Sequence, residues 1–242
     1  MNAQQAIASD AIAEAVAAIA AETGAQPAAS NSEVAQAADV ILFATKPYQV
    51  ADVCAEIRSY IRPTQLFVSI CAGVRTQKIE DALGSSARVV RVMPNTPALI
   101  GCGSAAIAPG RNASPDDLNI VKAMFDSVGT SVIVEEEKLD LVTGLTGSGP
   151  AYVFRFIEAL LQAGTDLGLS DAEAKTLVPQ MVLGAARMAI ESGKPLHELR
   201  QNVTTKGGTT EAGLKVLEEG DFAQLVYDCV EAATRRSREL AN

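Results

Sequence analysis

The sequence is poor in the histidine and cysteine residues that bind zinc, and its basic residues are outnumbered by acidic ones. Its 242 residues contain one histidine, four cysteines without C-x-x-C spacing, and no tryptophan. This composition excludes a Cys/His zinc site, and we expect buried thiols in a reducing compartment. Lysine and arginine number 20 against 29 aspartates and glutamates, and they form no stripe. We therefore expect neither a metal nor a nucleic-acid partner.

Long apolar runs are also missing. No segment reaches the roughly 20 apolar residues that span a bilayer. The opening MNAQQAIASD lacks the charged and apolar regions of a signal peptide. The sequence therefore predicts no membrane contact and a cytoplasmic location. Hydrophobic residues still make up 48% of the chain, enough for one large or two smaller domains. The expected partners are small molecules and further copies of the chain.

The hydrophobic pattern changes near residue 136. Before it, strand patterns alternate with helical ones, which predicts crossover connections and a largely parallel sheet. After it, only helical patterns occur, so the chain is expected to form an α/β domain followed by an all-α domain. The predicted strands are 40–45, 66–70, 87–93, 104–108 and 131–134.

Several residues mark helix boundaries. Ser148 and Pro150 predict the start of a helix, with proline in the first turn where its missing N–H costs nothing. Ser170 and Glu173 have the spacing of a capping box. Pro179 is expected to kink or split the helix that follows.

A glycine-rich phosphate turn is absent where a dinucleotide-binding domain would carry it. Residues 1–25 contain a single glycine, Gly24, which is expected to end a helix. The segment GCGSAA at 101–106 fits G-x-G-x-x-A formally, but it leads into no helical pattern, so a turn between strands is favoured. GSGP at 147–150 precedes a helix and is interpreted as a hinge at the domain junction.

Five motifs, in order, resemble the pyrroline-5-carboxylate reductases: VILFATKP, SICAGV, RVMPNTPALIGCG, LVTGLTGSGPAYVF and LRQNVTTKGGTTEAGLKVLE. The resemblance runs from about Ala6 to Leu240. It implies a Rossmann-type N-terminal domain, residues 1–135, and an all-helical dimerisation domain, residues 136–242. It also implies reduction of a cyclic imino acid, 1-pyrroline-5-carboxylate, to L-proline with NADP(H) or NAD(H), in a homodimer or higher homo-oligomer.

Two departures from the family pattern leave alternatives open. AIASD matches the family's second strand, so a unit of about 25 residues with the glycine-rich turn is expected to be missing. Lys206 stands where the family usually has proline. One alternative is a cofactor-incompetent dimeric remnant of this family. Another is a β-hydroxyacid dehydrogenase, which would need a catalytic lysine that Lys206 matches only by its position.

The resemblance assigns site residues by position. Thr210 is implied as the catalytic residue, with Gly208, Thr209 and Glu136 also on the substrate side. Ser9 and Asn31 are implied near the adenosine ribose and its 2′-phosphate, and Asn202 near the nicotinamide. Two loops are implied along the cofactor, and they consist of Ala44, Thr45, Lys46 and Pro47, and of Ile70, Cys71 and Ala72.

The chemistry of the TTKGGTT segment follows from its glycines. Gly207 and Gly208 leave backbone N–H groups bare at the start of a predicted helix, where the helix dipole favours a carboxylate. Thr210 would then donate a hydrogen bond to the ring nitrogen of the substrate. The segment could instead be an ordinary loop and cap. Similarly, Asn31 could cap a helix, and Cys71 could be a small buried hydrophobe. His197 is expected at the surface.

Overall fold

The computed structural model describes residues 6–241 and divides into two compact units. One unit consists of Met1–Gly147 together with Ala233–Asn242, and the other of Ser148–Ala232. The first unit therefore contains both the α/β segment and the last turns of the C-terminal helix.

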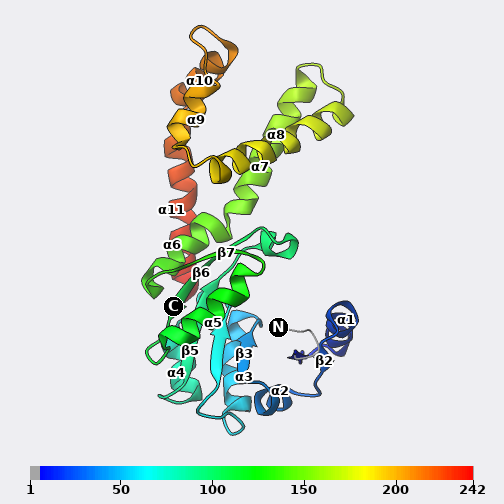
Figure 1. The fold of residues 1–242 in the computed structure, drawn as a ribbon, viewed down its shortest axis with the longest axis vertical. Helices are drawn as coiled ribbons and strands as arrows, with labels where there is room; N and C mark the ends of the chain where they lie inside the picture. The colour runs from blue at the N-terminus through cyan, green and yellow to red at the C-terminus, as the bar shows by residue number, and fades with distance from the viewer. Residues whose placement is uncertain (1–5, 242) are drawn as a thin grey trace. The chain divides into compact units, whose positions relative to one another are not determined.

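The first unit is built on a five-stranded sheet with the order β3-β4-β5-β6-β7 (Figure 1). Three of its four pairings are parallel, as expected, but β6 runs antiparallel to β5. No crossover occurs between β5 and β6, because the connection 94–102 is too short to carry the chain back to the end of the sheet where β5 begins. A separate parallel pair joins β1 and β2. The strands are β1 (Ile7–Ala8), β2 (Gln26–Pro27), β3 (Val40–Phe43), β4 (Leu66–Ser69), β5 (Arg88–Met93), β6 (Gly103–Pro109) and β7 (Gly129–Ile133).

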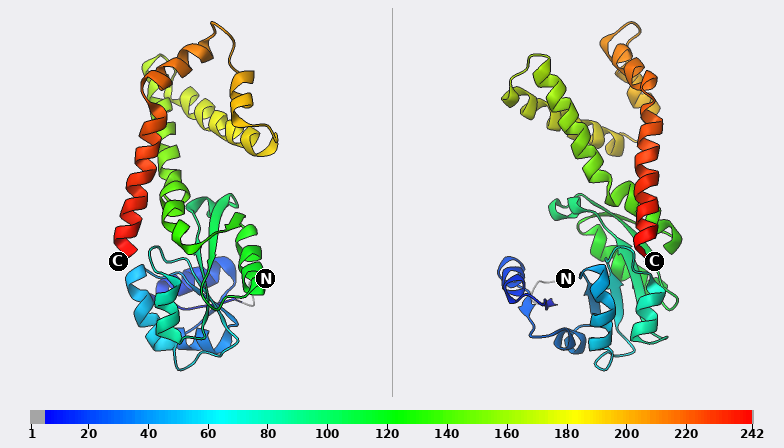
Figure 2. Two further views of the ribbon diagram at one scale, coloured as in Figure 1. Left: turned by 90° about the vertical axis from the view of Figure 1, so that its left-hand side faces the viewer. Right: turned by 180° about the vertical axis from the view of Figure 1, so that it is seen from behind.

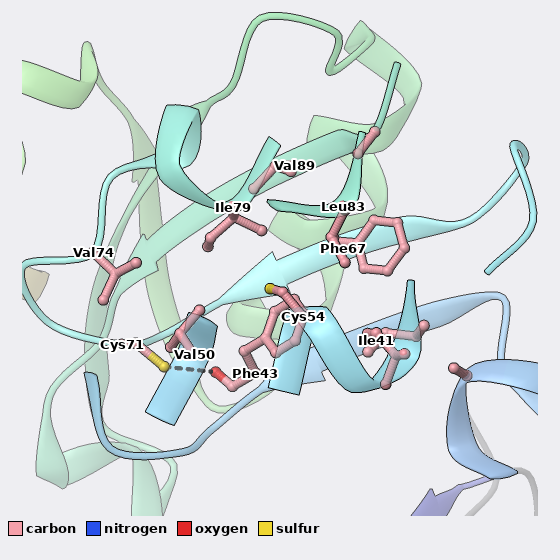
Figure 3. Close-up of a cluster of buried hydrophobic side chains, with 13 residues drawn as sticks. Ile41, Phe43, Val50, Cys54, Phe67, Cys71, Val74, Ile79, Leu83 and Val89 are labelled. Carbon is pink, nitrogen blue, oxygen red and sulfur yellow. Dashed lines mark hydrogen bonds between the residues drawn. The ribbon is translucent and has the colours of Figure 1, made fainter. Parts of the chain in front are cut away.

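Helices cover both faces of this sheet. The side chains of Ile41 and Phe43 on β3 and of Phe67 on β4 pack with α3 and α4 (Figure 3). The alternate residues of β4, β5 and β6 pack with α5. The unit contains α1 (Ala13–Thr23), α2 (Asn31–Ala37), α3 (Val50–Ile57), α4 (Thr76–Leu83), α5 (Pro115–Asp126) and α6 (Leu139–Val142). It also contains the 3₁₀ turns η2 (Pro47–Gln49), η3 (Thr96–Ile100) and η4 (Glu136–Lys138), and the π-helical turn η5 (Thr143–Gly147).

The ends of the first two helices test the predicted caps. Gly24 ends α1 in the left-handed conformation, with φ of 76°, as its position predicted. The suggested capping role of Asn31 is wrong, because the cap of α2 is Ser30. The Ser30 hydroxyl accepts a hydrogen bond from the backbone N–H of Glu33, and Asn31 is the first helical residue. Asn31 therefore has a side chain that is not used by the cap.

The second unit is entirely helical, as predicted, and α7 packs against α8 (Figure 2). The predicted capping box is confirmed: Ser170 Oγ donates to Glu173 Oε2 at 2.6 Å and accepts from Glu173 N at 3.3 Å. Pro179 lies inside α8 without splitting it. The helices are α7 (Gly149–Asp166), α8 (Asp171–Glu191), α9 (Leu196–Asn202), α10 (Thr209–Glu219) and α11 (Phe222–Ala241), whose last residues belong to the first unit.

The second unit has almost no core of its own. Within Ser148–Ala232, Ala174 is the single residue that the structure shows as buried. Large apolar side chains on all of its helices are exposed, among them Phe154, Met181 and Val216. None of the helices in residues 6–241 combines the length and apolar character required to span a membrane.

Candidate active site

Two of the expected cofactor loops lie side by side at the carboxyl ends of β3 and β4. Ile70 N donates to Phe43 O, which continues the pairing of the strands beyond their ends. The Cys71 thiol donates to Thr45 O at 3.2 Å and lies 3.5 Å from Phe43 O (Figure 3). Cys71 therefore fixes the loop after β3 against the loop after β4. Its side chain points into the core, which matches its interpretation as a buried group, while Ala44–Pro47 and Ala72 are exposed.

A second buried thiol lies in the same core cluster. Cys54 on α3 is fully buried, and burial, followed by the neighbouring Cys71, raises the pKa of Cys54 to about 12. Charging a thiol in an apolar core is costly, so Cys54 stays neutral at physiological pH. It acts as a packing residue in the core cluster that also contains Cys71.

The two residues expected near the ribose are in direct contact. Ser9 Oγ donates to Asn31 Oδ1 at 2.7 Å, and Asn31 Nδ2 donates to Glu56 Oε2, also at 2.7 Å. Ser9 follows β1, Asn31 begins α2 and Glu56 lies on α3, so three elements meet at this point. The contact orients the Asn31 amide at the carboxyl end of a parallel strand, where doubly wound domains bind ligands.

The residues present fit part of a nicotinamide dinucleotide. Exposed residues follow two adjacent parallel strands, at 44–47 and at Ala72, and Gly73 has a positive φ of 76° in the second loop. In residues 6–241, no strand leads through a G-x-G-x-x-G turn into a helix. The described residues therefore fit the sides of the cofactor, and none of them forms the usual pyrophosphate cradle.

Three of the four residues expected on the substrate side, Gly208, Thr209 and Thr210, lie at the start of α10. Gly208 N donates to Thr205 O at 2.9 Å, and Gly207 has φ of 72°, so residues 205–208 form a tight turn with glycine at its left-handed position. A Cβ on Gly208 would lie 2.9 Å from Thr205 O, so a side chain there would collide with the turn. Glycine is thus needed at both positions.

The helix that follows this turn has an open N-terminus. No side chain caps α10 at Gly208, and the Glu211 carboxylate turns back to accept from Gly207 N at 2.7 Å. The backbone N–H groups of Thr209 and Thr210 carry the partial positive charge of the helix end. Thr210 is half-buried and Thr209 is exposed. A carboxylate fits this arrangement.

Glu136 contacts the first residue of α4, four positions after the loop 70–72, and Asn202 lies at the end of α9. Asn202 is the exposed last residue of α9. The Glu136 carboxylate accepts from both N and Oγ1 of Thr76 at 2.8 Å and pairs with Arg91 at 3.4 Å. Glu136 therefore satisfies the first turn of α4, a contact across 60 positions that no sequence spacing indicates. His197 is exposed on α9, as expected.

Sequence reasoning also missed the role of Asn95, which it placed in the turn PNTP. The Asn95 amide donates to Ser104 Oγ and Thr146 O, and its oxygen accepts from Ser104 N. It thereby joins η3, β6 and the π-helical turn. A separate cavity of about 230 Å³ lies at the opposite end of the sheet and is lined in part by Arg62, Gln65 and Phe67. Arg62 already bonds Asp39 and two backbone carbonyls, so this cavity offers no obvious chemistry.

The fold and the strand-end loops define the class of protein: a two-domain NAD(P)-dependent oxidoreductase with a Rossmann-like unit and a helical dimerisation region. Residues 136–240 match the family model for pyrroline-5-carboxylate reductase dimerisation. Residues 2–73 match the model described as NADP oxidoreductase, coenzyme F420-dependent.

Relatives of known identity agree over most of the chain. Pyrroline-5-carboxylate reductase of Methanosarcina acetivorans is 40% identical over 91% of this chain and 82% of its own. The solved structure from Coxiella burnetii has a TM-score of 0.92 at 36% identity, covering 98% of this chain and 88% of that one. The Plasmodium falciparum structure, with NADP bound, has a TM-score of 0.82 at 37% identity, covering 91% and 84%. The chain belongs to the pyrroline-5-carboxylate reductase family.

Proposed function

We propose that this chain catalyses the NAD(P)H-dependent reduction of 1-pyrroline-5-carboxylate to L-proline, the last step of proline biosynthesis. Membership of the family supports the reaction. The open N-terminus of α10, preceded by Gly207 and Gly208, is the observation that carries the substrate assignment. It offers an anionic substrate fixed N–H donors that need no rearrangement. A cytoplasmic location belongs to the same proposal.

In this proposal the residues at the start of α10 bind different groups of the substrate. The N–H groups that follow Gly208 hold the substrate carboxylate, and Thr209 completes this contact. A bound nicotinamide cofactor supplies the hydride for the carbon of the C=N bond. The Thr210 hydroxyl donates a hydrogen bond to the ring nitrogen, where electron density accumulates during reduction, and the nitrogen takes up a proton from solvent to give the secondary amine of proline. Thr210 thus stabilises charge that is small in the ground state and larger in the transition state.

The remaining site residues, apart from Glu136, orient the cofactor in this proposal. We assign the ribose end to Ser9 and Asn31, the nicotinamide end to Asn202, and a substrate-side position to Glu136. NADP(H) is the proposed cofactor, with NAD(H) as the alternative, and the NADP-bound relative supports the first choice. The loops along the cofactor are Ala44, Thr45, Lys46 and Pro47, and Ile70, Cys71 and Ala72.

The active form is proposed to be at least a homodimer built through residues 136–242. The family model for dimerisation covers nearly all of this region. The exposed apolar side chains of Ser148–Ala232, with Ala174 alone buried, support pairing because a second copy can supply the core that one copy lacks.

Three measurements test this function. Steady-state kinetics with pyrroline-5-carboxylate and NADPH or NADH should show turnover to proline, and calorimetry should show cofactor binding. Light scattering should give at least a dimer at micromolar concentration. A stable dimer that neither binds the cofactor nor reduces pyrroline-5-carboxylate would contradict the proposed enzyme and favour a non-catalytic member of the family.

A further inference from the structure

The connection between β5 and β6 presents two bare aliphatic side chains. Residues 96–103, TPALIGCG, which we call the apolar tip, contain no charged residue. Leu99 is 89% exposed and Ile100 is 79% exposed, and they are adjacent in η3. A single exposed leucine is ordinary. Two neighbouring aliphatic side chains that are almost completely exposed forgo the free energy that burial of apolar surface provides.

The apolar tip is held in one conformation. Gly101 ends η3 with φ of 73° and donates to Ala98 O at 3.1 Å, and Cys102 N donates to Pro97 O at 3.0 Å. A Cβ on Gly103 would lie 2.8 Å from the Ala98 Cβ, so the base of the tip is closely packed. A rigid apolar group loses little conformational freedom when it is covered.

The tip is also fixed to the region that the family model assigns to dimerisation. Asn95, at its base, donates from Nδ2 to Thr146 O at 3.1 Å. Met93, which leads into the tip, packs so closely on Gly147 that a Cβ there would lie 2.5 Å from its Cε. Thr146 and Gly147 lie within the matched residues 136–240, and the adjacent Leu145 is 52% exposed. The base of the apolar tip is therefore attached directly to the dimerisation region.

We propose that the apolar tip is part of the dimer interface and packs against a second copy of this chain. This inference rests on the homodimer in the proposed function. The interface then extends beyond the helices into the α/β unit, and Leu99 and Ile100 are the residues that extend it. The uncharged sequence of the tip and its link to Thr146 favour this occupant.

Introducing negative charge into the apolar tip tests the proposal. The double variant Leu99→Asp with Ile100→Asp should raise the dimer dissociation constant at least tenfold by sedimentation, because each carboxylate would be desolvated at the interface. Ile12→Asp is the matched control. Ile12 is 61% exposed in the same unit, at the cap of α1, where aspartate is favoured. Equal dissociation constants for the double variant and the control would overturn the proposal.

A labelling experiment needs no disruptive variant. Cys102 lies in the tip and is exposed in a single copy, as is Cys229, so the expectation of buried thiols holds only for Cys54 and Cys71. In a Cys229→Ser background, maleimide labelling of Cys102 should be slower above the dimer dissociation constant than below it. Labelling rates that do not depend on protein concentration would overturn the role of the tip while leaving the dimer intact. A wild-type chain that stays monomeric at all concentrations would overturn both.

Discussion

Ser237 donates a 2.7 Å hydrogen bond from its hydroxyl to Oδ1 of Asp140, across 97 positions of the sequence. Both residues are buried, and they join the end of α11 to α6 within the first unit. This pair is one of the contacts that tie the last turns of α11 to the first unit, whereas the preceding turns of the same helix belong to the second.

We expect Ser237→Ala to lower the free energy of unfolding by about 1–3 kcal/mol, because a buried carboxylate loses a donor. Urea unfolding followed by circular dichroism measures this difference. Ser59→Ala is the control, because Ser59 is exposed in the turn after α3. Equal losses in the two variants would show that the bond contributes nothing specific.

Glu136→Gln should weaken the start of α4. Its carboxylate accepts from Thr76 and pairs with Arg91, and the variant removes the negative charge at the helix N-terminus. We expect a loss of about 1 kcal/mol in the free energy of unfolding, against no change in Glu137→Gln, an exposed neighbour. The same variants test the substrate-side assignment. A raised KM in Glu136→Gln with unchanged kcat would make Glu136 a substrate ligand.

Thr210→Val should reduce turnover by about one to three orders of magnitude, because it removes the donor and keeps the branched shape. Cofactor affinity should hardly change. Thr209→Val is the matched control, since Thr209 is exposed and its assigned contact is with the substrate carboxylate. Single-turnover kinetics with pyrroline-5-carboxylate separate this effect from binding. Wild-type turnover in Thr210→Val would remove this residue from the mechanism.

Lys206→Pro should stabilise the turn before α10. Gly208 N bonds Thr205 O, and Gly207 has φ of 72°, so Lys206 occupies the position where type II turns favour proline. We expect a gain of about 0.4–1 kcal/mol, because proline restricts the unfolded chain. Substrate affinity should be equal or better. A tenfold weaker substrate affinity would identify the Lys206 ammonium as a carboxylate ligand.

The pKa of Cys54 predicts a loss of stability in alkali. Its folded-state pKa of about 12 lies above the ordinary value of 9.0, so the folded state holds the proton more tightly than the unfolded state. Its contribution is therefore complete below pH 9 and declines as pH rises towards 12. Between pH 8 and 10.5, wild type should lose more unfolding free energy than Cys54→Ala. Cys102→Ala, at an exposed position, should keep the wild-type slope.

Local features of this fold could be predicted from the sequence, and long-range features could not. The cap at Gly24 and the box formed by Ser170 and Glu173 depend on neighbours within four positions, and both are confirmed. The direction of β6 was missed because alternation of apolar residues is the same in parallel and antiparallel strands. The cap of α2 was misplaced by one residue because Ser30 and Asn31 are both good caps.

In the candidate site, too, local features could be predicted from the sequence and long-range contacts could not. The role of the glycines before α10 was predicted from their lack of side chains. The structure adds that Lys206 occupies the second position of the turn formed by residues 205–208. The contacts of Glu136 with Thr76 and of Asn95 with Thr146 join residues 60 and 51 positions apart, so only the folded chain brings them together.

Ala174 is the single buried residue of Ser148–Ala232 in one copy of the chain. Dilution is therefore expected to destabilise this part of the protein, because it separates the paired copies. Its melting temperature should rise with protein concentration, since mass action on the paired state supplies the stability that one copy lacks.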